Sequence, residues 1–338
     1  MRLIIVEKPA VARALAKAAK ATWPDDELII LSAVTITMVS FILPRGLAYS
    51  SYPMTTEPQC KPDPERWHEP HFEFCWANEV IDTGLAPTIR LTIEATSDLI
   101  NRADHIVCAP DWDYSGVWGI EQVFKLFRPN LIDQDLPVIT NIWPLDGEAI
   151  AQRFSNMKTT KLFEYQTLKN AGRIKFYFDY NYALNSLPVL GNLYRDVFET
   201  DQPVFISKYA LQTLFYVNEQ GEKSINRIEC DMAGHHWMGT GKYQVDSYRH
   251  LDGIGSPASR LCITRQLVSL GLCKLTEAKI SVTEKGLEFI ARLHEDTRDS
   301  DLPFRLDLWM EMPFEEAKSK IDTYLKTFFG KQKRYQKI

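Results

Sequence analysis

Two acidic fragments that lie more than a hundred residues apart could together bind a metal ion. Glu7 follows the apolar run Leu3–Val6, and Asp111 and Asp113 follow the apolar run Ile106–Ala109. Carboxylates are the ligands that divalent cations such as Mg²⁺ take where they assist phosphate chemistry. The alternative is that these acids only cap two helices, because Asp and Glu favour helix N-termini in any case.

Each acidic fragment ends a segment that has the pattern of a buried parallel strand. The carboxyl ends of such strands meet at one edge of an open α/β sheet, where ligands bind. Pro9 then stands where the first turn of a helix accepts proline, and residues 11–19 are strong helix formers. The sequence therefore predicts two strand–helix units that bring Glu7, Asp111 and Asp113 to one edge.

The rest of residues 1–145 completes a predicted α/β domain with a parallel sheet flanked by helices. Its further elements are a β-rich stretch (28–38), a loop (44–70), a helix (88–102), a strand (103–109), a helix (116–127) and a closing strand (138–144).

Residues 146–338 form a mainly α-helical second domain in this prediction. A capped helix (256–271), a hairpin (273–283) and a helix (284–293) follow one another near its end. This order indicates a winged-helix-like unit over 252–295, which commonly binds nucleic acid. The alternative is a small helical subdomain that only packs.

Composition indicates a soluble protein without a membrane partner. The chain has 338 residues, 45% of them hydrophobic and 25% charged, with a formal net charge of −5. No apolar run approaches the ~20 residues that span a bilayer. The first segment does not have the pattern of a signal peptide. We therefore expect a cytoplasmic location.

Cysteine usage and charge patches suggest further partners. No C-x-x-C pair occurs, so free thiols are expected. One group of residues could bind zinc: Cys60, His68, His71 and Cys75. The alternative is that their proline-rich segment is a surface loop. Residues 153–175 and 326–337 are strongly basic. Such patches suit a DNA backbone, while solvated helix faces would explain them as well.

Six fragments follow one another along the chain: Met1–Arg13, Asp111-x-Asp113, Asp179–Asn185, Ile206–Thr213, Asp252–Arg260 and Val282–Gly286. The first resembles the opening of the TOPRIM domain of type IA DNA topoisomerases, closest to the topoisomerase III branch. The second falls at that family's D-x-D-x-E motif. The others resemble its D-W-x-x-G-x-N, L-S-x-G-R-V-Q-T-P, D-G-[IL]-G-T-x-A-T-R and T-E-K-G segments.

The resemblance implies an isomerase that passes single DNA strands with the help of Mg²⁺. Glu7, Asp111 and Asp113 would hold the metal, and Glu7 and Lys8 would assist the phosphoryl chemistry. A tyrosine would attack the phosphodiester, and Tyr243 is the best candidate. The corresponding DNA contacts would be made by Arg173, Lys208, Gln212, His236 and Arg260.

The departures from the family pattern weaken this chemistry. The third acid of the motif falls on Ser115, its basic neighbour on Tyr114, and two further arginine positions on Ala210 and Pro188. Those side chains cannot make the bidentate bonds that guanidinium makes to phosphate. Residues 214–250 are also too short for the long gate that the family inserts there.

Three hypotheses remain open from the sequence. The chain could be a reduced topoisomerase-like protein that binds single-stranded DNA without passing strands. It could be an active minimal Mg²⁺-dependent topoisomerase or TOPRIM nuclease. It could also be a non-catalytic scaffold with protein partners in a DNA-processing or DNA-transfer complex.

Overall fold

The computed structural model describes residues 1–33, 39–63, 72–76, 88–89, 91–233, 253–255 and 257–336. These residues form two compact units, the first from Met1–Ile42 and Gln59–Arg173, the second from Leu43–Pro58 and Ile174–Ile338. The division falls within helix α7 (Phe163–Ser186). The domain boundary predicted after residue 145 stays a prediction.

The first unit is built on a mixed sheet with strand order β6-β5-β2-β1-β7-β8-β9. Its centre is parallel, as the sequence predicts, whereas the strands at both edges run antiparallel to their neighbours. The parallel strands are β1 (Arg2–Val6), β2 (Leu28–Ala33), β7 (His105–Ala109) and β8 (Pro137–Val138). The edge strands are β5 (Phe72–Trp76), β6 (Thr88–Ile89) and β9 (Lys158–Thr159).

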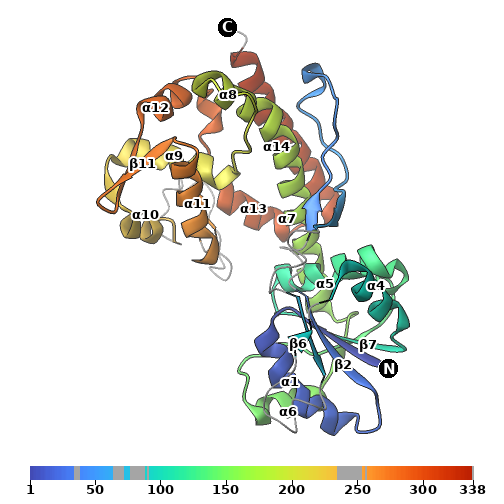
Figure 1. The fold of residues 1–338 in the computed structure, drawn as a ribbon. Helices are drawn as coiled ribbons and strands as arrows, with labels where there is room; N and C mark the ends of the chain where they lie inside the picture. Colours follow the sequence, from blue (N-terminus) through green and yellow to red (C-terminus); the bar gives the residue numbers. More distant parts are fainter. Residues whose placement is uncertain are drawn as a thin grey trace. The chain divides into compact units, whose positions relative to one another are not determined.

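Helices cover both faces of this sheet, which is why β1 is apolar and buried from Leu3 to Val6 (Figure 1). Alternate residues of a strand point to opposite faces. Leu3 and Ile5 belong to the core beneath α4 (Ile93–Arg102) and α5 (Tyr114–Phe127). Ile4 and Val6 belong to the core beneath α1 (Pro9–Thr22) and α6 (Gly147–Ser155).

Three predicted elements need correction. The helix predicted from residue 88 begins only at Ile93, after Thr92 caps it by accepting a hydrogen bond from the Ala95 amide at 3.2 Å; residues 88–89 form β6. The closing strand ends after Val138, and Asn141 adopts a left-handed φ of 48° that extended backbone does not allow. The predicted loop 44–70 contains strand β4 (Cys60–Pro62), paired with β3 (Val39–Phe41).

The second unit is mainly α-helical, as predicted. Its helices after α7 are the π-helical segment η4 (Leu187–Gly191), α8 (Asn192–Phe198), α9 (Lys208–Gln220), α10 (Ile225–Asp231), α11 (Pro257–Ser269), α12 (Glu284–Ala291), α13 (Leu302–Met310) and α14 (Phe314–Tyr335). The predicted hairpin is confirmed as β11 (Cys273–Thr276) and β12 (Lys279–Val282), and β10 (Lys223–Ser224) pairs with β12 to give the order β10-β12-β11.

Residues 43–58 join the second unit because two asparagines of α7 bind their backbone. The Asn185 side chain accepts from the Met54 amide at 2.8 Å and donates to its carbonyl at 2.7 Å. Asn181 makes the same two bonds to Thr56, at 2.8 and 3.0 Å. Each amide thus imitates a neighbouring strand. None of the described helices is long and apolar enough to cross a bilayer.

Candidate functional site

The strand register brings the predicted acids to one edge of the sheet. The parallel pairing of β1 with β7 ends at Val6 and Ala109, so Glu7 and Asp111 follow at the same end of neighbouring strands. Asp113 lies at the N-cap of α5, where its carboxylate accepts a hydrogen bond from the Gly116 amide at 2.8 Å. The predicted convergence is therefore present, and one of the three acids also caps a helix, as the alternative proposed.

Glu7 and Asp111 each keep a carboxylate oxygen without a partner. Oε2 of Glu7 and Oδ1 of Asp111 are buried and accept no hydrogen bond from any described residue. The other Asp111 oxygen, Oδ2, forms an ion pair with Nζ of Lys8. A buried carboxylate oxygen without a hydrogen bond costs folding free energy, and a bound cation would compensate for that cost. These two atoms are therefore candidate cation ligands.

The electrostatics of this edge agree with that chemistry. Burial, together with the charges of Asp111 and Asp113, raises the pKa of Glu7 to about 7 against the opposing effect of Lys8. The ion pair with Asp111 in turn raises the pKa of Lys8. A divalent cation would hold Glu7 ionised, because the positive charge compensates both for burial and for the neighbouring carboxylates.

Gly116 also belongs to this site, although the sequence motif assigns it no role. A Cβ atom at this position would lie 2.4 Å from the Asp111 carbonyl oxygen and 2.9 Å from Oε2 of Glu7. Real Cβ atoms do not approach other atoms so closely. The first turn of α5 can therefore pack behind the acids only because residue 116 is glycine.

The residues present fit a Mg²⁺ ion that is held by two carboxylates and completed by water or phosphate oxygens. Mg²⁺ is commonly bound in this way, through one or two carboxylates plus phosphate groups of the substrate. Glu7 and Asp111 would supply the two oxygens. Within the described ranges, no group of three or more His, Cys, Asp or Glu side chains is arranged to hold a metal by itself.

Lys208, predicted to contact DNA, lies in a partly buried ion cluster of the second unit. Its Nζ pairs with Oδ1 of Asp179, whose Oδ2 pairs with Lys175. Burial lowers the pKa of Lys208 to about 8 although Asp179 opposes this. Burial raises the pKa of Asp179, but both lysines outweigh it and bring that pKa to about 2. The i,i+4 spacing of Lys175 and Asp179 indicates their ion pair from the sequence, but it does not indicate the pairing of Asp179 with Lys208.

The other residues predicted to contact DNA lie in different environments. The Gln212 side chain is buried, donating to the Thr297 carbonyl at 2.9 Å and accepting from the Asp299 amide at 2.7 Å, so both ends of its amide have partners inside the unit. Arg260 lies half-buried on α11, and Arg173 is exposed on α7. Their contacts with DNA stay predictions.

Several predicted residues cannot be placed. Tyr243, His236, His68 and His71 lie outside the described residues, as does the side chain of Cys75. Of the candidate zinc ligands only Cys60 is described; its thiol lies 3.7 Å from Oε1 of Gln122, and burial raises its pKa.

Comparison with known proteins gives a weak structural likeness. No family model matches the chain, and no curated protein matches it. Among solved structures, full-length topoisomerase I from Thermotoga maritima is similar over 65% of this chain, with 16% identity and a TM-score of 0.34. The match covers 31% of that protein, so the chain spans less than a third of its length.

Proposed function

We propose that this chain is a type IA topoisomerase-like protein that binds single-stranded DNA and does not pass strands. The observation that carries the proposal is the pair of unpartnered carboxylate oxygens of Glu7 and Asp111 beside Lys8, at the carboxyl edge of parallel strands. In this proposal the first unit is a TOPRIM domain. A bound Mg²⁺ ion would neutralise charge on a DNA phosphate, and Lys8 would pair with the same group.

The topology of the second unit supports DNA binding. Along the chain α9 is followed by β10, α10, α11 and the β11–β12 hairpin, and the sheet order is β10-β12-β11. We infer that α11, the β11–β12 hairpin and α12 belong to the winged-helix-like unit predicted over 252–295, in which α11 and the hairpin would contact nucleic acid. Arg265 on α11 and Lys274 and Lys279 on the hairpin are exposed, as such a surface requires.

The proposed lack of strand passage rests on what the sequence lacks. Ser115 stands in place of the third acid, and residues 214–250 leave too little chain for a gate around a DNA strand. Tyr243 remains the candidate nucleophile of the alternative, an active minimal enzyme. A raised Glu7 pKa and a neighbouring Lys8 would equally serve a nuclease, which needs a metal and no covalent tyrosine.

One set of assays separates these functions. Supercoiled plasmid is incubated with the chain and Mg²⁺, covalent adducts are trapped, and single- and double-stranded oligonucleotides are tested by gel shift at low salt, where electrostatic affinity is greatest. We expect preferential binding of the single strand with neither relaxation nor adduct. If the wild type relaxes the plasmid and Tyr243→Phe does not, the chain is an active topoisomerase. If the wild type nicks the plasmid without forming an adduct and Asp111→Ala does not nick it, the chain is a nuclease. If neither oligonucleotide is bound at all, the chain is a scaffold.

A further inference from the structure

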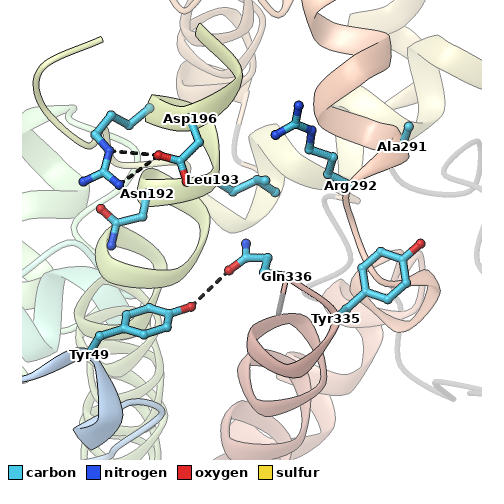
Figure 2. A pocket seen from close by; sticks show the side chains of 9 residues that line it. Tyr49, Asn192, Leu193, Asp196, Ala291, Arg292, Tyr335 and Gln336 are labelled. Atoms are coloured by element: carbon cyan, nitrogen blue, oxygen red, sulfur yellow. Dashed lines mark hydrogen bonds and ion pairs between the residues drawn. The ribbon is translucent and has the colours of Figure 1, made fainter. Parts of the chain in front are cut away.

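A cavity of about 710 Å³ in the second unit has no role in the proposed function (Figure 2). It lies between α8, α12, the last turn of α14 and the short 3₁₀ helix η2 (Tyr49–Ser51). Its size falls within the range of small-molecule sites, roughly 300–1,000 Å³. The lining combines two tyrosines, two arginines and side-chain amides.

Tyr49 is held in one orientation within this cavity. Its hydroxyl donates to Oε1 of Gln336 at 3.0 Å, and Nε2 of Gln336 donates to the Val189 carbonyl at 3.2 Å. Nζ of Lys333 lies 4.8 Å from the Tyr49 ring centre and donates to the Tyr49 carbonyl at 2.8 Å. A ring fixed in advance binds a planar ligand without a further ordering cost.

Tyr335 supplies a second and more accessible ring. Figure 2 shows Tyr49 and Tyr335 on opposite sides of Gln336. Tyr335 is 43% exposed although it lines a cavity, and the centres of the Tyr335 and His294 rings lie 5.6 Å apart in an edge-to-face arrangement. An exposed tyrosine ring in such a place can stack on a flat aromatic group.

The charged residues that line the cavity are Arg195, Asp196 and Arg292, so the two guanidinium groups outnumber the one carboxylate. Arg195 pairs with its neighbour Asp196 at 2.8 Å, and Arg292 pairs with Glu288 at 2.6 Å. All four side chains are at least 40% exposed, and ion pairs so exposed hold their partners weakly. A phosphate can therefore recruit both guanidinium groups, which bind it through paired N–H donors.

We propose that this cavity binds one nucleotide, with its base stacked on a tyrosine ring and its phosphate bound by Arg195 and Arg292. Base stacking on aromatic side chains tolerates any base sequence. The nucleotide is either free or one unit of a single DNA strand, and only the second case rests on the proposed function.

The test measures the affinity of the full chain for two probes, dAMP by calorimetry and labelled oligo(dA) by fluorescence anisotropy. Tyr335→Ala removes a stacking ring, Tyr335→Phe keeps it, and Arg292→Ala removes a phosphate ligand. Arg298→Ala is the matched control, because Arg298 is 54% exposed and pairs with Glu219 but does not line the cavity. We expect both cavity-directed alanine variants to bind at least one probe roughly tenfold more weakly, with Tyr335→Phe and Arg298→Ala within about twofold of wild type.

Each outcome decides the proposal. Weaker binding of both probes supports a pocket for free nucleotides, and weaker binding of oligo(dA) alone supports a strand-bound nucleotide. The proposal is overturned if neither alanine variant changes either affinity, or if Arg298→Ala weakens binding as much. Failure of the wild type to bind oligo(dA) contradicts the proposed function instead, and dAMP then still tests the cavity on its own.

Discussion

Gly116 approaches Glu7 so closely that a Cβ atom at position 116 would lie 2.9 Å from Oε2 of Glu7. The first turn of α5 is therefore packed directly behind the carboxylate edge of the sheet. This turn also carries the Gly116 backbone amide that donates to the Asp113 carboxylate, so the helix contacts the acidic edge through both packing and a hydrogen bond.

Substitution Gly116→Ala should destabilise the first unit. The added methyl group overlaps the Asp111 carbonyl oxygen, which is backbone and cannot move away cheaply. We expect a loss of about 1–3 kcal/mol in the free energy of unfolding, measured in urea. Gly147→Ala is the matched control, because nothing lies within 4 Å of its Cβ position. Equal stabilities of the two variants would contradict the packing described here.

The stability of the metal-free protein should fall as pH rises toward neutrality. The Glu7 pKa is raised from 4.5 to about 7, so between these values the folded chain keeps a proton that the unfolded chain has lost. Ionised Glu7 then costs about 3 kcal/mol above pH 7, and Glu7→Gln removes this cost. We expect Glu7→Gln to gain stability relative to wild type from pH 5 to pH 8 in chelator. A difference that does not vary with pH would contradict the raised pKa.

The sequence predicts the centre of the first unit well, because its strands are continuous apolar runs buried on both faces. It also predicts that Glu7 and Asp111 meet, since that follows from parallel strands alone. The unpartnered oxygens and the need for Gly116 depend on side-chain packing, which spacing does not reveal. The antiparallel edge strands depend on pairings between distant segments.

The linear motifs are less informative about the second unit. They mark Lys208 and Gln212 as DNA contacts, but the partners that bury them are remote: Asp179 for Lys208, and Thr297 and Asp299 for Gln212. The cavity between α8 and α14 has no signal in the sequence, because its residues come from four separate segments.

Asp179 should be important for the stability of the second unit. Asp179→Ala leaves Lys175 and Lys208 close together without their shared counter-ion. Because this cluster is only partly buried, we expect a loss of about 1–3 kcal/mol, less than for a fully buried ion pair. Glu316→Ala, which breaks the exposed pair with Lys320, is expected to cost less than about 1 kcal/mol. Chemical denaturation compares the two variants, and a similarly small loss in both would contradict a stabilising role of Asp179 as the counter-ion of the two lysines.

DNA affinity should depend on the cations of α11 and the β11–β12 hairpin. Arg265→Ala and Lys274→Ala are expected to weaken binding of single-stranded DNA and to reduce the slope of log K against log salt by about 0.7 each, one phosphate contact apiece. Arg102→Ala, exposed on α4 of the first unit, should leave the slope unchanged. Identical slopes in all variants would place the DNA elsewhere.

The most direct test of the site at Glu7 and Asp111 is thermal unfolding with and without Mg²⁺. At pH 8 we expect Mg²⁺ to raise the Tm of the wild type by a few degrees, and by less at pH 6, where Glu7 holds a proton. The rise should disappear in Glu7→Gln and Asp111→Asn and persist in Asp104→Asn, whose carboxylate is 72% exposed and pairs with the N-terminus. An equal rise in all four proteins, or none in the wild type, would contradict a Mg²⁺ site at this edge.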